Sequence, residues 1–178
     1  MSGQRLLIGA VTGTAFGCML WASAAGGAPP SPPPRTAPEK THLAIFDDLD
    51  FNVFSGQKWD QLSHSHSKDI AVHWPDGHVT HGIDVHIRDL KAMFVYAPDT
   101  NIKEHPVRIA AGDWTAVTGV MRGTFTKPMT MGNKTIQPTG KSFELQMATF
   151  GHWKNGVMDE EWLYWDNQTY MKQLGLAP

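Results

Sequence analysis

The sequence predicts an α+β fold, a cone-shaped, curved antiparallel sheet wrapped on N-terminal helices. Three observations lead to this prediction. Helical spacing opens the folded part, a second helical segment follows a short hairpin, and four strand-like segments then run to a last short helix. With 178 residues, of which 41% are hydrophobic, the chain has the size of one domain with its own core. A sheet curved over helices leaves a cavity, and such cavities are common small-molecule pockets.

Residues 1–24 have the pattern of a secretory signal peptide. Arg5 is followed by an apolar run over residues 6–21, and Ala22-Ser23-Ala24 is a small-residue cleavage site. A retained membrane anchor is the alternative, but a span needs about 20 apolar residues, and this run is shorter and diluted by Gly and Thr. A lipoprotein anchored at Cys18 also stays open. We therefore expect an exported protein, periplasmic or extracellular, that has no cysteine once it is cleaved.

Residues 25–40 are rich in Pro and lack apolar periodicity, so they predict a disordered linker. The cone domain is then expected over residues 41–178. Its first helix is indicated by apolar side chains at three-to-four spacing, with Thr41 as the N-cap and Gly56 as the stop. The apolar positions of this helix, which should face the core, are Leu43, Phe46, Leu49 and Val53 or Phe54.

The remaining elements follow from turn residues and from changes of period. A helical turn is predicted at Trp59–Leu62, and Pro75-Asp76-Gly77 marks a turn between two short strands. Three-to-four spacing returns from Ile83 to Phe94 and ends before Pro98, which predicts a second helix. The four strand-like segments cover residues 101–113, 114–126, 142–153 and 157–166, and a last helix covers residues 167–176.

Charge and motifs disfavour several classes of function. The formal net charge is -2 and Lys and Arg are spread thinly, so there is no basic stripe for phosphates, and we expect no nucleic-acid partner. The sequence has no Gly-rich phosphate loop after a strand and no Gly-x-Ser-x-Gly motif, which disfavours nucleophilic catalysis. Seven Trp and nine His are the unusual features of the composition.

The last hairpin carries the candidate site. Its turn is either the two residues Asn155-Gly156 or, with Lys154, a three-residue loop with a bulge. The second reading is preferred because it sorts the side chains into two different faces. Face one carries Glu144, Gln146, Ala148, Phe150 and His152 with Met158, Glu160, Trp162, Tyr164 and Asp166. Face two is mostly apolar and carries Phe143, Leu145, Met147, Thr149 and Trp153 with Val157, Leu163 and Trp165.

Face one is predicted to line the cavity, because its aromatic side chains are too apolar to be exposed in a row. The expected facing pairs are Glu144 with Asp166 and Gln146 with Tyr164, with His152 diagonal to Glu160. Two carboxylates facing each other in a poorly hydrated pocket cannot both ionise cheaply, so one pKa should rise, and Asp166 is the candidate general base. His152 and Glu160 then form a second catalytic cluster, with His152 about 25 Å from Asp166. The alternative is that face one is the solvent side of a half-buried sheet.

The histidines give a weaker signal. A metal site needs three or four converging ligands, and His78 and His81 straddle a short strand while only His86 lies on a helix. We therefore predict turn and surface histidines and no metal site, although His86 can look into the cavity and Trp74 can form its rim. The predicted substrate-binding side chains are Glu144, Gln146, Phe150, Trp162, Tyr164, His86 and Trp74.

Four stretches resemble the SnoaL-like polyketide (ester) cyclase family of the nuclear transport factor 2-like superfamily. They are HWPDGHVTHGID, AAGDWTAVTGVMRGTF, PTGKSFEL and NGVMDEEWLYWDNQTYMKQLGL, and the resemblance covers residues 41–176. It implies an α+β cone, frequent dimers, no metal or organic cofactor, and a cavity carboxylate that acts as acid and base in an intramolecular aldol cyclisation. The resemblance places Glu160, Trp162 and Asp166 on family positions, with the catalytic role at Asp166. The export signal and the many His depart from the family.

These features predict acid/base chemistry of cyclase, isomerase or dehydratase type on a small hydrophobic, carbonyl-bearing molecule. A non-catalytic binding protein of the same fold is the first alternative, and a His-based metal-binding protein is the second. Face two would expose a large apolar surface on a monomer, so we expect a homodimer packed through it.

The predicted signal peptide gives a first test. Because Ala22-Ser23-Ala24 is the best small-residue site, the mature protein should begin at Ala25. N-terminal sequencing of the protein from its native host measures this directly. A soluble cytosolic protein that still carries Met1 would contradict the predicted export.

Overall fold

The computed structural model describes residues 33–178, so the predicted signal peptide and the first half of the predicted linker lie outside the described residues. The helices are α1 (Ala37–Asp48), its π-helical continuation η1 (Leu49–Phe54), the 3-10 helix η2 (Trp59–His64), α2 (Ile83–Tyr96) and α3 (Asn167–Gln173). The strands are β1 (His66–His73), β2 (Val79–His81), β3 (Asn101–Ile102), β4 (Arg108–Ala111), β5 (Trp114–Thr124), β6 (Met129–Met131), β7 (Lys134–Ile136), β8 (Ser142–Lys154) and β9 (Val157–Trp165).

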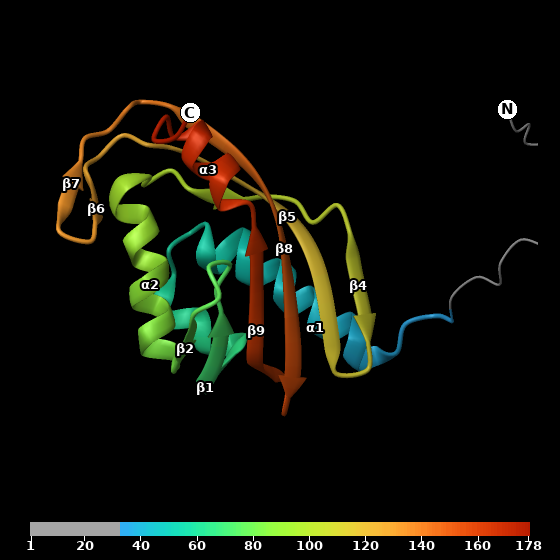
Figure 1. Ribbon diagram of the computed structural model, residues 1–178. Coiled ribbons are helices and arrows are strands. Elements are labelled where there is room, and N and C mark those ends of the chain that lie inside the picture. The colour runs from blue at the N-terminus through green and yellow to red at the C-terminus, as the bar shows by residue number, and fades with distance from the viewer. Residues whose placement is uncertain (1–32) are drawn as a thin grey trace, which may run out of the picture. The chain divides into compact units, whose positions relative to one another are not determined.

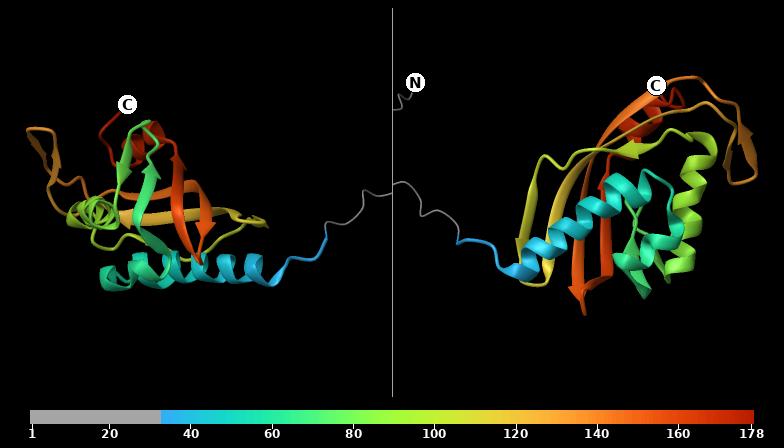
Figure 2. Two further views of the ribbon diagram at one scale, coloured as in Figure 1. Left: turned by 90° about the horizontal axis from the view of Figure 1, so that it is seen from below. Right: turned by 180° about the vertical axis from the view of Figure 1, so that it is seen from behind.

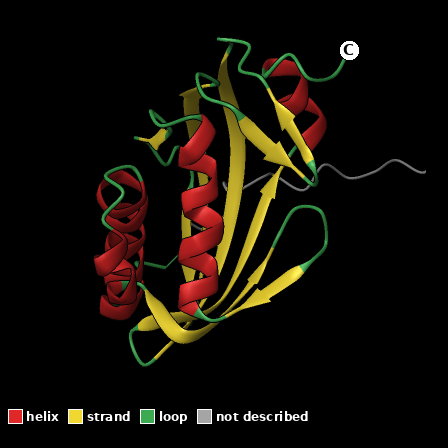
Figure 3. Ribbon diagram, turned by 90° about the vertical axis from the view of Figure 1, so that its left-hand side faces the viewer, coloured by secondary structure: helices red, strands yellow, loops and turns green. Residues whose placement is uncertain are grey.

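One curved sheet forms the body of the domain. Its strand order is β2-β1-β9-β8-β5-β3, and β4 also pairs with β5. All neighbours are antiparallel except β1 and β9, which are parallel. The sheet arches over α1 and α2 (Figures 1 and 3), and the view from behind shows α1 crossing the concave side (Figure 2). The predicted fold class is confirmed. Within residues 33–178, no helix is long and apolar enough to cross a bilayer.

Helix α1 begins earlier than the sequence analysis predicts. Thr36 is the N-cap, and Thr41 lies inside the helix, so the predicted cap was wrong. The Glu39 backbone N–H donates to Thr36 Oγ1 at 3.4 Å, and the Thr36 backbone N–H donates to Glu39 Oε2 at 2.6 Å. This capping box starts α1 although Pro38 lies in its first turn. The first N–H groups of a helix have no intrahelical acceptor, so a proline there removes no hydrogen bond. The predicted apolar positions of α1 and η1 are all buried in the core.

The hairpin of β8 and β9 combines parts of both predicted turns. Lys154 pairs with Val157, so Asn155 and Gly156 form a two-residue turn, with positive φ angles of 54° and 85°. The pairing then shifts between His152 and Trp153, and this bulge restores the predicted sorting into two faces except at Met158. Met158 was predicted on face one, but it pairs with Trp153 and is buried in the core. The predicted pairs were wrong by two positions, because Tyr164 lies opposite Ala148 and His152 lies directly opposite Glu160.

The assignment of the two faces to cavity and surroundings was also wrong. Face two packs against the helices, with Phe143, Leu145, Trp153 and Leu163 each at most 7% exposed. Face one points outward, and Tyr164 is 52% exposed and Phe150 41% exposed. The physical reason is that the more apolar face gains more by covering the helices. Face two is therefore not free for a dimer. The homodimer stays a prediction.

Candidate functional site

The concave side of the sheet and the helices enclose a narrow cavity. Its walls are mainly apolar and aromatic, and its polar side chains are few. The lining residues are Leu49, Asp50, Phe54, His66, Trp74, His86, Leu90, Met93, Ile102, Met121, Met147, Thr149, Glu161, Leu163 and Trp165. This composition is typical of a small-molecule pocket.

The first polar wall residue is Asp50, in the π-helical turn η1. A π-helical turn is rare and occurs often at functional sites, because the extra residue changes where side chains point. Asp50 is 9% exposed and lies among the buried apolar positions Leu49 and Val53. A buried carboxylate in such surroundings needs a hydrogen-bonding partner to remain charged.

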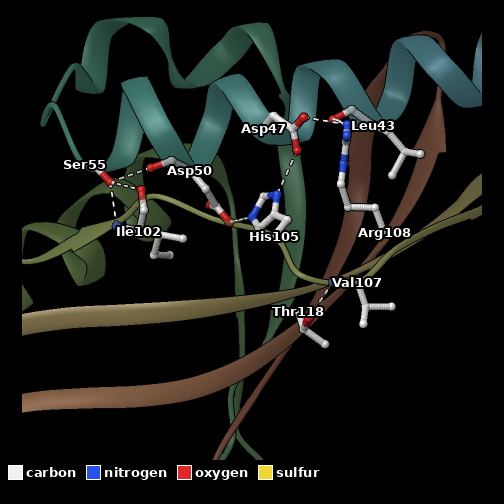
Figure 4. Close-up of polar contacts among 9 residues, drawn as sticks. All are labelled: Leu43, Asp47, Asp50, Ser55, Ile102, His105, Val107, Arg108 and Thr118. Atoms are coloured by element: carbon white, nitrogen blue, oxygen red, sulfur yellow. Dashed lines mark hydrogen bonds and ion pairs between the residues drawn. The ribbon is translucent and has the colours of Figure 1, made fainter.

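The partner of Asp50 is His105, from the segment between β3 and β4. His105 Nε2 lies 2.7 Å from Asp50 Oδ2, and His105 Nδ1 lies 2.8 Å from Asp47 Oδ1. Figure 4 shows the imidazole between the two helical carboxylates. Arg108 forms an ion pair with Asp47 Oδ2 at 2.5 Å. These contacts make one polar row of Asp50, His105, Asp47 and Arg108. The His105 side chain is 1% exposed, and Asp47 is partly open to solvent. The row therefore connects the cavity with the surface of the domain.

The charges of this row are coupled. Burial raises the pKa of Asp50, and the hydrogen bond from His105 opposes that rise. Burial alone would lower the pKa of His105, but the hydrogen bonds and charges of Asp50 and Asp47 raise it above its usual value. With both ring nitrogens next to carboxylates, the arrangement suits an imidazolium that donates on both sides.

A second polar cluster lies deeper in the same cavity. His66 begins β1, His86 lies in the first turns of α2, and Glu161 lies in β9. Glu161 Oε2 is 3.6 Å from His66 Nε2 and 3.5 Å from His86 Nε2. These are ion-pair distances, too long for hydrogen bonds. One ligand atom from each of the three residues lies within 4.8 Å of the others, so the cluster could hold a metal ion.

Burial sets the protonation of this second cluster. It lowers the pKa of His86 to about 4, with only partial opposition from the Glu161 charge, so His86 is neutral near pH 7. Burial would raise the pKa of Glu161, but His66 and His86 lower it below its usual value. The cluster therefore combines a carboxylate with at least one neutral imidazole in the wall of a mainly apolar cavity.

Two of the predicted site residues lie in the cavity, namely His86 and Trp74. Asp166 does not. It is the N-cap of α3, where its Oδ1 accepts the backbone N–H of Gln168 at 2.8 Å and its Oδ2 accepts the hydroxyl of Thr169 at 2.6 Å. These bonds, the one from the Thr169 hydroxyl first, lower the pKa of Asp166. The predicted rise of this pKa was wrong, because Asp166 is exposed and faces no second carboxylate.

The other predicted site residues lie on the outer face. Glu144 forms an ion pair with Arg122 of β5 at 3.0 Å, and Gln146 is exposed. His152 Nδ1 lies 2.6 Å from Asp159 Oδ1, and Glu160 Oε1 lies 2.7 Å from His73 Nε2. Phe150, Trp162 and Tyr164 line a shallow hollow together with Trp114. The structure thus separates these residues from the cavity by the thickness of the sheet.

Sequence analysis missed four polar side chains of the site, and two of them had a signal. Asp50 lies four residues after Phe46 and three before Val53, so helical spacing puts it on the apolar face. Glu160 and Glu161 are neighbours in a predicted strand, so their side chains point to opposite faces and one of them must share the face of Leu163. His66 and His105 had no such signal, because a bulge follows His66 in β1 and His105 lies outside any regular element.

The curved sheet and its enclosed cavity define a cone protein of the nuclear transport factor 2-like superfamily. Within it, the chain belongs to the SnoaL-like polyketide cyclase family, whose family model matches residues 48–174. The resemblance seen in the sequence is confirmed. A comparison with curated proteins gives no match.

Solved structures support the same fold. A protein from Jannaschia sp. CCS1, provisionally assigned as a SnoaL-like polyketide cyclase, has a TM-score of 0.72 and 17% identity, over 83% of this chain and 100% of its own. IdmH from Streptomyces antibioticus, provisionally assigned as a polyketide cyclase, has a TM-score of 0.63 and 23% identity, over 79% of this chain and 99% of its own. A Catenulispora acidiphila protein with a ketosteroid isomerase-like fold has a TM-score of 0.59 and 14% identity, over 77% and 93%. At these identities the likeness concerns the fold.

The raised pKa of His105 predicts how stability depends on pH. At a pH above 6.5, the usual pKa of histidine, His105 keeps a proton in the folded protein that it loses in the unfolded chain. The contribution of this proton is complete below pH 6.5 and is lost as the pH rises through the folded pKa. The free energy of unfolding, measured by urea titration, should therefore fall over this interval by up to about 1.4 kcal/mol per pH unit.

A matched pair of variants isolates this effect. His105→Gln should remove that pH-dependent fall, whereas His81→Gln, at an exposed histidine of β2, should keep it. An equal slope in wild type and His105→Gln would contradict the assignment of the proton to His105.

Proposed function

We propose that the chain is an exported SnoaL-like enzyme that moves a proton on a small hydrophobic, carbonyl-bearing molecule inside its cavity. Cyclases, isomerases and dehydratases all use such a step. The single observation that carries the proposal is Asp50, a buried carboxylate in the wall of a mostly apolar cavity. Membership of the SnoaL-like polyketide cyclase family supports the class of reaction.

Asp50 would be the base. Burial raises its pKa above that of a free carboxyl group, which makes its carboxylate a stronger base. His105 binds Oδ2, so Oδ1 is the oxygen that would meet the substrate. The apolar walls keep the reacting carbon away from bulk water, where a carboxylate is a weak base toward carbon.

The other polar groups would position Asp50 and the substrate. His105 fixes the Asp50 carboxylate, and Asp47 fixes His105 through its second nitrogen. The cluster of His66, His86 and Glu161 would orient a carbonyl oxygen at the other polar part of the cavity. Trp74 and Trp165 would hold a flat molecule between them and the apolar wall.

The proposal is tested with 5-nitrobenzisoxazole, a small flat probe. A base removes the C–H proton of its isoxazole ring, the N–O bond breaks, and the product is a coloured cyanophenolate. Wild type should accelerate this reaction. Asp50→Asn, which keeps the shape of the side chain, should slow it by about 10²–10⁴-fold. Binding, followed by quenching of the fluorescence of Trp74 and Trp165, should change little.

Asp60→Asn is the control, because it makes the same chemical change at an exposed position of η2. Unchanged turnover in Asp50→Asn would remove Asp50 as the base. Loss of turnover in Asp166→Asn alone would return that role to the position predicted from the sequence. A wild type that binds the probe and does not turn it over would favour a binding protein of the same fold.

A further inference from the structure

We propose that His66, His86 and Glu161 bind one divalent transition-metal ion in the wall of the cavity. The three residues are far apart in the sequence, and β1, α2 and β9 bring them together. All three side chains are at most 5% exposed. The inference does not rest on the proposed proton transfer, because metal binding is measured without turnover.

The donor atoms are spaced like ligands of one metal ion. Glu161 Oε2 lies 3.6 Å from His66 Nε2 and 3.5 Å from His86 Nε2. Two ligands that share one ion, each at 2.0–2.2 Å with a tetrahedral angle between them, are roughly 3.3–3.6 Å apart. The observed distances therefore fit a shared ion, whereas direct hydrogen bonds would require shorter contacts.

Two of these three donor atoms have no other partner in the described part of the chain. Among residues 33–178, His66 Nε2 and Glu161 Oε2 are fully buried and accept or donate no hydrogen bond. Leaving a buried polar atom without a partner costs about 1–3 kcal/mol, and more for a charged group. An ion between the imidazoles and the carboxylate would satisfy both atoms.

The His66 ring is also held in place by Ser65. The Ser65 hydroxyl donates to the Leu62 carbonyl at 3.1 Å, so Ser65 Oγ is left to accept from His66 Nδ1 at 2.8 Å. This hydrogen bond orients the ring so that its Nε2 faces Glu161, 3.6 Å from Oε2. Second-shell hydrogen bonds of this kind orient metal-binding histidines.

The donor set indicates the class of metal. Two imidazoles and one carboxylate are the ligands of His₂Glu zinc sites and of non-haem iron(II) sites, whereas Ca²⁺ and Mg²⁺ prefer oxygen ligands alone. Three protein ligands leave coordination positions open, and these would face the cavity, because all three residues line it. An ion there would polarise a carbonyl oxygen as a Lewis acid.

The experiment uses the untagged mature protein, freed of metal by a chelator and dialysed against Zn²⁺. Elemental analysis should then find one Zn²⁺ per chain. Glu161→Gln should lose this stoichiometric binding. Ser65→Ala, which leaves all three ligands in place, should weaken the Zn²⁺ affinity by about 10–100-fold. Co²⁺ should give the visible absorption of a site with nitrogen and oxygen ligands in wild type but not in Glu161→Gln.

The double variant His78→Ala/His81→Ala is the control for surface binding, because both histidines are exposed. It should keep the stoichiometry and the affinity. The proposal is overturned if wild type binds no stoichiometric Zn²⁺, or if only the surface variant loses it. Should Glu161→Gln fail to fold by circular dichroism, an affinity of Ser65→Ala equal to that of wild type would overturn the proposal. Asp50→Asn should still bind Zn²⁺, so a failure of metal binding can be told apart from a failure of the proposed proton transfer.

Discussion

The hydrogen bonds of buried His105 to Asp47 and Asp50 are the interaction on which the chemistry of this domain depends. They join the helical segment of α1 and η1 to the chain between β3 and β4, and the rings of Phe46 and Phe51 pack against the imidazole at centroid distances of 5.9 and 4.6 Å. A carboxylate inside an apolar cavity is unfavourable unless it is paired. Asp50 can keep its charge at the cavity wall because His105 donates to it. Removing one partner of such a buried pair costs about 3–5 kcal/mol.

The cavity therefore has two polar parts in otherwise apolar walls. One is the row that runs from Asp50 through His105 to Asp47 and Arg108 at the surface, and the other is the cluster of His66, His86 and Glu161. The two parts influence each other, because the charge of Glu161 adds to the rise in the pKa of Asp50. A small carbonyl compound could use both, with its oxygen at the cluster and its acidic carbon at Asp50. This division of roles is what a proton transfer next to a carbonyl requires.

The sequence predicted most of the fold and little of the site, and the physical reasons differ. Apolar spacing identified the helices that carry Leu43 and Leu90, and alternation sorted the side chains of β8 and β9 into their two faces. Alternation does not say which face is covered, because the covering helices are remote in the sequence. The aromatic side chains of face one, such as Phe150 and Tyr164, therefore led to the wrong prediction that this face lines the cavity. His105 belongs to no periodic pattern of the sequence, because it lies between β3 and β4, and only its tertiary contacts reveal its role.

The central claim is that Asp50 meets the reacting atom of a molecule bound in the cavity. The most direct measurement is a crystal structure with 5-nitrobenzotriazole. This compound has the shape of 5-nitrobenzisoxazole and carries a ring N–H in place of its acidic C–H. The account predicts that this nitrogen lies within about 3.2 Å of Asp50 Oδ1, with the ring between the apolar walls. A ring bound only on the outer face, beside Tyr164 and Asp166, with no contact to Asp50, would contradict it.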